Sequence, residues 1–187
     1  MAMPQIKDHW TVADRDALPD DGNRYEVIDG ELFVSPAPAL RHQQAVGVLY
    51  RIVADYLDRE HVGYVFVAPA DVVFSPTRGV QPDVLVLPLA NGRRPEHFDD
   101  VRHVLLAVEV LSPSTARADR VAKRRLYREE KVDEYWIVDL DARTFERSTP
   151  ADPMVEVLAD VLEWRPADSA APLSIDLPSY FTRVLDT

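Results

Sequence analysis

The 187-residue sequence contains no cysteine and only three lysines, beside 18 arginines. Without cysteine the chain has no disulfide, no thiolate metal site and no cysteine nucleophile. It also has no apolar run near the roughly 18 residues that a membrane-spanning helix needs, and its N-terminus lacks the apolar stretch of a signal peptide. These absences predict a cytoplasmic protein that is not associated with a membrane.

Basic residues are in the minority, because 21 Lys and Arg against 32 Asp and Glu give a formal net charge of -11. This charge argues against a protein that coats nucleic acid through bulk electrostatic attraction. It leaves open an enzyme that meets a polyanion through a bound metal and a local basic surface. Glycine-rich phosphate loops, histidine-rich metal motifs and dinucleotide-binding fingerprints are missing, so kinases, zinc hydrolases and dehydrogenases have no support.

The apolar pattern predicts helices that alternate with strands only in the middle of the chain. Asp29-Gly30 between two apolar-containing runs is typical of a hairpin turn. The expected elements are a hairpin at 24–35, helices at 11–18, 40–59, 116–130 and 178–185, strands at 64–67, 71–74, 83–87, 103–111, 134–139, 143–147, 154–158 and 161–165, and a polar loop at 88–100.

This order predicts an α/β (α+β) fold with a central mixed β-sheet flanked by helices, an N-terminal β-hairpin and a C-terminal β meander. The length suits one domain. We expect that domain over residues 24–187, after an Asp-rich lead-in segment at 1–23.

Two carboxylates occupy positions where strand propensity alone would not put them. Asp83 opens the apolar run 84–87, and Glu109 interrupts the run at 104–111. Acidic side chains are rarely buried unless they are paired or bind a metal. Each could also sit at a strand end and reach water or an arginine. If the two strands are neighbours, however, Asp83 and Glu109 offer the hard oxygen ligands that Mg²⁺ prefers.

The strings Gln81-Pro-Asp83 and Val108-Glu-Val-Leu111 resemble the PD-(D/E)XK nuclease signature, except that Leu111 stands where the signature has lysine. A longer string, Glu109-Val-Leu-Ser-Pro-Ser-Thr115 followed by Asp119 and Lys123, resembles the Uma family of restriction endonucleases. Further matching strings are Arg24-Tyr-Glu-Val-Ile-Asp-Gly-Glu31, Ser35-Pro-Ala-Pro38 with Arg41-His42, and Glu134-Tyr-Trp-Ile-Val-Asp139. The resemblance covers nearly the whole chain and implies a restriction-endonuclease-like core.

The resemblance also implies that the lysine of the signature has moved to the helix after the Glu109 strand. Lys123 is the candidate, because Lys7 lies in the N-terminal segment and Lys131 ends the helix. Lysine, unlike arginine, can lower its pKa enough to help activate water. Lys123 could instead be one more solvated charge on the helix. Asp119, four residues earlier on the same helix face, could orient Lys123 or form an exposed ion pair with it.

Further candidates surround these residues. The helix that carries the lysine has six basic residues against three acidic ones, and we expect Arg117, Arg120 and Arg124 to contact phosphates. His42 could contact phosphate, cap a helix or be structural. Glu26 could add a third carboxylate to the catalytic group, or it could face solvent from the first strand of the hairpin.

These residues predict a divalent-metal-dependent endonuclease that hydrolyses phosphodiester bonds of DNA. Asp83, Glu109 and the carbonyl of Val110 would hold Mg²⁺ or Mn²⁺, which lowers the pKa of a bound water. Lys123 would position or deprotonate that water and offset developing negative charge. Cleavage of two strands in this superfamily often uses a dimer, so the resemblance implies a homodimer.

Two other functional classes compete with this interpretation. Since Leu111 replaces the usual lysine, the chain could be a catalytically degenerate nuclease-fold protein that binds nucleic acid or another protein without cutting. It could also be a β-rich scaffold without a site, in which case Asp83 and Glu109 would point apart.

Overall fold

The computed structural model describes residues 7–89, 92–94, 101, 103–152, 154–168 and 170–186. The helices are α1 (Val12–Asp16), α2 (Leu40–Glu60), the π-helical segment η2 (Ala118–Lys123), α3 (Arg124–Glu129) and α4 (Leu177–Leu185). The strands are β1 (Arg24–Ile28), β2 (Glu31–Ser35), β3 (Gly63–Val67), β4 (Val72–Ser75), β5 (Arg78–Val80), β6 (Val84–Pro88), β7 (Leu106–Val110), β8 (Glu134–Asp139), β9 (Thr144–Ser148), β10 (Glu156–Leu158), β11 (Val161–Trp164) and β12 (Leu173–Asp176).

The strands form three sheets. The largest is mixed and has the order β10-β9-β8-β7-β6-β3, with β7 parallel to β8 and the other neighbours antiparallel. A second, antiparallel sheet has the order β2-β1-β5-β4, and β11 pairs with β12 in a third. The predicted α/β fold with a central mixed sheet is therefore confirmed.

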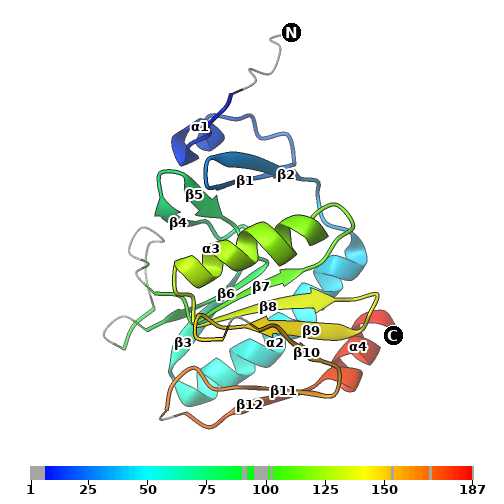
Figure 1. Ribbon diagram of the computed structural model, residues 1–187. Coiled ribbons are helices and arrows are strands. Elements are labelled where there is room, and N and C mark those ends of the chain that lie inside the picture. Colours follow the sequence, from blue (N-terminus) through cyan, green and yellow to red (C-terminus); the bar gives the residue numbers. More distant parts are fainter. Residues whose placement is uncertain are drawn as a thin grey trace.

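Helices cover both faces of the six-stranded sheet, with α2 on one face and α3 on the other (Figure 1). Successive side chains of a strand point to opposite faces, which explains two separate cores. Val84 and Val108 pack with Leu49 of α2, whereas Leu85 and its neighbours pack with Leu126 of α3. β7 is buried along its whole length, as its continuous apolar run predicted.

The N-terminal hairpin follows its sequence signal closely. Asp29 and Gly30, with φ of 53° and 82°, form the turn between β1 and β2. Residues before the hairpin pack onto the four-stranded sheet: Trp10 N–H donates to the Gly30 carbonyl at 2.8 Å, and Val12 N–H donates to the Pro76 carbonyl at 2.8 Å. α1 thus lies against the turns at one end of this sheet (Figure 1).

Several expectations about individual elements need correction. The strand at 161–165 was expected beside β9 and β10, but β11 lies in its own hairpin with β12, because Leu162 and Trp164 face the core under α2. The helix expected at 116–130 contains the π-helical segment η2. Strand β5, with only three residues and a glycine at its centre, was not predicted. The loop expected at 88–100 and the first six residues lie largely or wholly outside the described residues.

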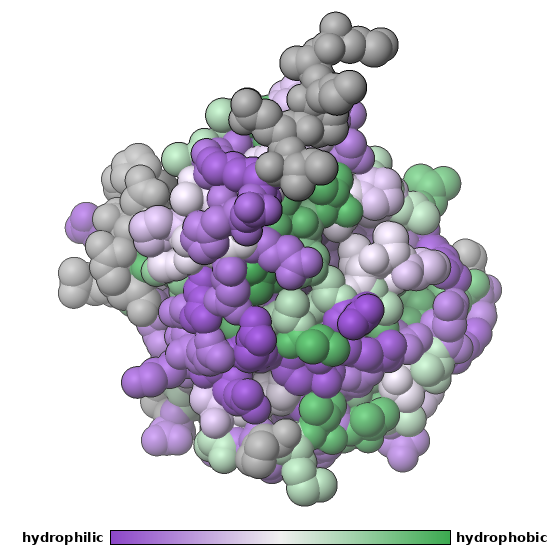
Figure 2. Space-filling model, turned by 45° about the horizontal axis from the view of Figure 1, so that its top comes forward, coloured by the Kyte–Doolittle hydropathy of each residue, from purple (hydrophilic) through white to green (hydrophobic). Residues whose placement is uncertain are grey.

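None of the helices in the described ranges is long and apolar enough to cross a membrane. On the face of the molecule that Figure 2 shows, hydrophilic residues predominate and hydrophobic residues lie in separate patches. That face is therefore mainly polar.

Candidate active site

The pairing of β6 with β7 brings Asp83 and Glu109 together. Val84 lies opposite Val108 in this ladder, so one step further along the same register sets Asp83 opposite Glu109. Opposing residues of an antiparallel pair have Cβ atoms about 4.5–5.5 Å apart. Val110 N–H donates to Asp83 Oδ2 at 2.9 Å and ties the two positions together. The scaffold alternative, in which these carboxylates point apart, is therefore wrong.

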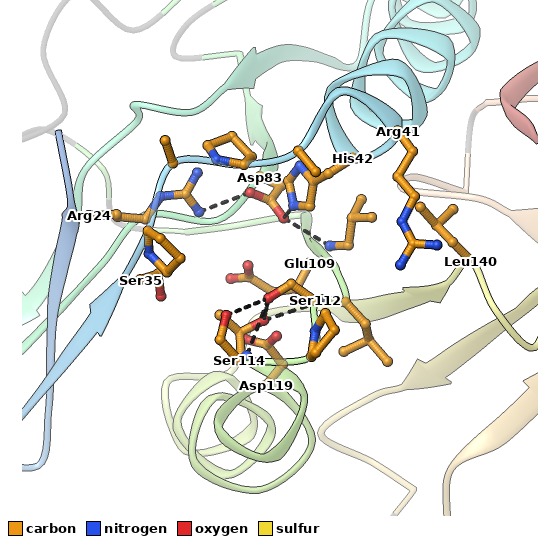
Figure 3. A pocket seen from close by; sticks show the side chains of 18 of the residues that line it. Arg24, Ser35, Arg41, His42, Asp83, Glu109, Ser112, Ser114, Asp119 and Leu140 are labelled. Atoms are coloured by element: carbon orange, nitrogen blue, oxygen red, sulfur yellow. Dashed lines mark hydrogen bonds and ion pairs between the residues drawn. The ribbon is translucent and has the colours of Figure 1, made fainter.

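Asp83 and Glu109 open into a pocket of about 240 Å³. Its walls come from the end of β2 with the following loop, the start of α2, and the loop between β7 and the η2 helix (Figure 3). Lining residues include Arg24, Glu26, Ser35, Pro36, Arg41, His42, Leu111, Ser112, Ser114, Asp119, Lys123 and Leu140. Besides the two carboxylates, four separate parts of the chain line the pocket, namely β1, residues 35–42, residues 110–123 and Leu140.

Three donors hold the carboxylate of Asp83. Arg24 Nη1 lies 2.9 Å from Oδ1, and His42 Nε2 and Val110 N lie 3.0 and 2.9 Å from Oδ2. Figure 3 shows Arg24 and His42 on either side of Asp83. Burial alone would raise the pKa of Asp83, but His42, Arg24 and the Val110 N–H together lower it to about 2. Asp83 is therefore ionised throughout the neutral range.

Lys123 lies in a second group, surrounded by three carboxylates. Its Nζ is 2.8 Å from Glu109 Oε1, 2.8 Å from Glu26 Oε2 and 3.6 Å from Asp119 Oδ1. Glu26 also accepts the backbone N–H of Gln81 at 2.7 Å. Glu26 thus faces the site rather than solvent, and the ion pair between Asp119 and Lys123 is buried rather than exposed.

The charges of this group shift one another's pKa values. Burial raises the pKa of Glu109 well above its usual range, with Asp83 and Asp119 adding to the rise and Lys123 opposing it. For Lys123, burial lowers the pKa, but the carboxylates of Glu109, Glu26 and Asp119 raise it well above its usual range. The expected fall in the pKa of Lys123 is therefore absent, and in this setting Lys123 is a permanent cation.

Burial separates these side chains from the other charges of the protein. Glu26, Asp83, Glu109, Asp119 and Lys123 are each at most 3% exposed. Among the described residues, the one other buried charged side chain is an arginine of α1. Buried charges are costly unless they are paired. Their concentration at one pocket makes it the candidate functional site.

The helix after β7 presents its polar side chains to the sheet at intervals of four residues. Asp119, Lys123 and Tyr127 all lie on this face, and Tyr127 OH donates to Glu109 Oε1 at 3.3 Å. The first two belong to η2. π-Helical turns are rare and occur often at functional sites. Thr115 precedes this helix, and its carbonyl accepts the N–H of Asp119 at 3.0 Å.

The candidate phosphate-binding arginines lie outside the pocket that contains Asp83 and Glu109. Arg120 forms ion pairs with Asp139 at 2.8 Å and Glu146 at 2.7 Å, and Arg124 also pairs with Glu146. Arg117 is exposed. These carboxylates reduce the positive charge that Arg120 and Arg124 present to a polyanion.

One residue of the site was not singled out from the sequence. Arg24 lies two residues before Glu26 on β1, and residues two apart on a strand face the same side. The spacing of two residues between Arg24 and Glu26 was the sequence signal that could have placed Arg24 at the site. It could not reveal the partner of Arg24, because Asp83 is 59 residues away in the sequence.

Carboxylate and carbonyl oxygens are the donors that this pocket could offer to a hard cation. No group of three or more His, Asp or Glu side chains that could hold a metal ion occurs in the described part of the chain. The candidate donors are the carboxylates of Asp83 and Glu109 with the backbone carbonyl of Val110. Such a set fits Mg²⁺, which binds through one or two carboxylates and keeps several waters.

Comparison with known proteins gives a family and a fold. No curated protein matches the chain. A solved structure from Anabaena variabilis ATCC 29413, described as "a putative nuclease belonging to DUF820", is similar with a TM-score of 0.76 and 19% identity, over 94% of this chain and 99% of that one. Residues 12–175 match the family Uma2, described as "Putative restriction endonuclease". The chain belongs to the Uma2 family.

Proposed function

We propose that the protein is a divalent-metal-dependent endonuclease that hydrolyses phosphodiester bonds of DNA. The observation that carries this proposal is the pair of buried carboxylates, Asp83 and Glu109, with the Lys123 amine 2.8 Å from Glu109 Oε1. Membership of the Uma2 family supports the nuclease assignment.

Asp83, Glu109 and the carbonyl of Val110 would hold Mg²⁺ or Mn²⁺. When bound, the metal lowers the pKa of a coordinated water and polarises the scissile phosphate. Arg24 and His42 keep Asp83 ionised and fix its orientation. A cation must compete with these two side chains for the oxygens of Asp83, so metal binding is expected to shift at least one of them.

Lys123 would act in place of the lysine that the nuclease signature has at position 111. Leu111 packs against the core on the side of α3 and lines the pocket. Lys123 approaches Glu109 from the helix instead. Because its pKa is raised, we assign it the positioning of the attacking water and the neutralisation of negative charge rather than proton abstraction.

DNA would approach across the mouth of the pocket, whose lining includes the exposed Arg41. We propose that Arg117, Arg120, Arg124 and His42 contribute to binding of the phosphate backbone, with Arg117 the most accessible. A homodimer would allow cleavage of both strands, and sedimentation of the protein with and without DNA tests it.

Plasmid cleavage tests the proposed activity. With Mg²⁺ or Mn²⁺, the wild type should convert supercoiled DNA to nicked or linear forms, and Asp83→Asn should not. Asp186→Asn, in an exposed carboxylate paired with Arg143, is the matched control and should cleave normally. Cleavage by Asp83→Asn at the wild-type rate would reject the site.

A degenerate, non-cutting protein is the second candidate. In its favour, Arg24, His42 and Lys123 satisfy the site carboxylates without any metal. Calorimetry with Mn²⁺ separates the two candidates. Binding that is present in the wild type and lost in Glu109→Gln would reject the degenerate form.

A further inference from the structure

A second cavity adjoins the pocket of Asp83 and Glu109. It has a volume of about 340 Å³ and lies between η2, the first turn of α2 and the turn that joins β8 to β9. The two cavities share five lining residues, namely Arg41, Leu111, Ser112, Pro113 and Leu140. They are therefore neighbouring parts of one hollow in the surface.

The second cavity extends the pocket on the side away from the N-terminal hairpin. Figure 3 shows Arg24 on one side of the two carboxylates, and Arg41 and Leu140 on the other. A polynucleotide that is cut at the carboxylates has a neighbouring nucleotide on each side of the cut bond. The second cavity therefore lies where one of these neighbours would pass.

Two arginines line the second cavity, and each is paired with an aspartate of the same cavity. Arg41 Nη1 lies 2.9 Å from Asp141 Oδ1, and Arg120 Nη2 lies 2.8 Å from Asp139 Oδ2. The guanidinium group binds carboxylate and phosphate oxygens with the same donors. Each aspartate therefore occupies donors that a phosphate could otherwise take.

The two arginines differ in how easily they can leave their partners. Arg120 also pairs with Glu146 at 2.7 Å, so it remains bound if Asp139 is released. Arg41 and Asp141 form a pair in which both side chains are exposed, by 51% and 76%. Exposed pairs of this kind contribute little to stability, so they open at little cost. Arg41 is therefore the arginine that can exchange its carboxylate for a phosphate.

We propose that the second cavity binds the DNA phosphate next to the one that is cut, with Arg41 as the residue that holds it. Asp141 competes for Arg41 in the free protein. When DNA binds, the ion pair opens and the phosphate replaces the carboxylate at the guanidinium group. This inference rests on the proposed function, because it requires a DNA strand that passes Asp83 and Glu109.

Binding of a short DNA duplex in Ca²⁺, measured by fluorescence anisotropy, tests the competition without measuring cleavage. Asp141→Asn should bind about 2- to 5-fold more tightly than the wild type, because Arg41 no longer has to leave a carboxylate. Asp186→Asn is the matched control. It removes the same charge from an exposed pair with Arg143, which lies in the same turn but lines neither cavity. Its affinity should stay close to that of the wild type, because salt screens exposed charges.

A variant of Arg41 tests the phosphate contact itself. Arg41→Gln should weaken binding and reduce the slope of log affinity against log salt concentration by about 1, as expected for the loss of one phosphate contact. In the Arg41→Gln protein, Asp141→Asn should no longer tighten binding, because its effect acts through Arg41. Since the pair is exposed, all three variants should fold as the wild type does.

The other outcomes separate this inference from the proposed function. If Asp141→Asn binds DNA no more tightly than the wild type, or tightens binding equally with and without Arg41, the competition is rejected. An unchanged salt slope in Arg41→Gln would reject the phosphate contact. In each case, cleavage of plasmid DNA by the wild type would keep the endonuclease proposal. A wild type that neither binds nor cuts DNA would overturn both.

Discussion

Arg24 is the residue through which the N-terminal hairpin holds Asp83. Its Nη1 bonds both to Asp83 Oδ1 at 2.9 Å and to the Gln81 carbonyl at 3.2 Å. Removal of one partner from a buried ion pair leaves the other charge uncompensated, and this is more damaging than loss of a surface pair.

Arg24→Met should therefore lower the free energy of unfolding by about 2–3 kcal/mol in EDTA, since His42 still pairs with Asp83. Urea denaturation measures the loss. Arg143→Met, which breaks an exposed pair with Asp186, should change stability by about 0.5 kcal/mol or less. Because Arg24 competes with a metal for Asp83, Mn²⁺ should reduce the difference in the free energy of unfolding between Arg24→Met and the wild type. An equal difference in stability with and without Mn²⁺ would contradict the competition between Arg24 and the metal.

The sequence predicted those site residues whose type is unusual for their local surroundings. Asp83 and Glu109 stand in apolar strands, and Lys123 is a lone lysine among arginines. The burial of Asp119 and the raised pKa of Lys123 could not be predicted, because both depend on carboxylates that only tertiary packing brings together. The spacing of four residues on a helix predicted the contact between Asp119 and Lys123, but it did not predict that both side chains are buried among other carboxylates.

At the scale of elements, α1 and β5 pack closely enough to exclude a side chain at Gly79. A Cβ at this position would lie 2.8 Å from Val12 Cγ2 and 2.9 Å from Arg15 Nη1. Arg15 is in turn held by Asp71, with Nη2 to Oδ2 at 2.6 Å. The N-terminal helix is thus fitted to the sheet that presents Arg24 to the pocket.

Gly79→Ala should lower the free energy of unfolding by about 1–3 kcal/mol, because Val12 and Arg15 must move. Chemical denaturation measures the change. Gly47→Ala is the control: a Cβ there meets nothing within 4 Å in the middle of α2, so it should raise stability by about 0.5–1 kcal/mol. A neutral Gly79→Ala would mean that α1 is free to shift.

Arg78 joins the hairpin turn to the helix that carries the site lysine. It bonds to Asp29 at 2.6 Å, to Glu129 at 2.5 Å and to Glu130 at 2.6 Å. Burial alone would raise the pKa of Asp29, but Arg78 and Arg125 lower it below the ordinary value of 3.8. The resulting stabilisation is present above that ordinary value and is lost as the pH falls through the lower folded value.

Arg78→Met should therefore lose about 1–2 kcal/mol of stability near pH 7, because three charged contacts disappear. The difference from the wild type should shrink as the pH falls below about 4, where the carboxylates become protonated. Thermal unfolding across pH checks this trend. Arg125→Met, which removes one exposed contact to Asp29, should lose less stability. A stability difference between Arg78→Met and the wild type that does not change with pH would contradict the ion-pair explanation.

Element boundaries could be predicted where a strong pattern was present. The Asp29-Gly30 turn, the long helix α2 and strand β8 were all placed from periodicity and turn chemistry. Strands β5 and β12 were not predicted; they have three and four residues, and β5 has a glycine at its centre. The pairing of β11 with β12 could not be predicted. It depends on which of the two cores Leu162 and Trp164 enter, and the local sequence pattern does not specify this.

At the scale of the whole molecule, the negative net charge of the protein weakens the binding of a nucleic acid. The net charge is -11, and the carboxylates of Asp139 and Glu146 partly neutralise the arginines of the helix. A polyanion should therefore bind weakly unless a divalent cation first reduces the charge of the pocket.

A gel-shift or anisotropy titration of a short DNA duplex checks this expectation. With Ca²⁺ added, binding should weaken by about 10- to 100-fold between 50 and 200 mM salt, as for a few phosphate contacts. In EDTA, binding should be much weaker at every salt concentration. Equal affinity with and without the divalent ion would contradict the role of metal in recruitment.

The aromatic core beneath α2 has a consequence for when the site takes shape. Tyr180 of α4 donates its hydroxyl to the Ala45 carbonyl of α2 at 3.0 Å, and Trp164 packs against Trp136 of the central sheet. Every pocket carboxylate and Lys123 precede these aromatic residues in the chain. A polypeptide growing on a ribosome would thus carry all the reactive groups of the pocket before the aromatic residues that pack beneath α2 are made.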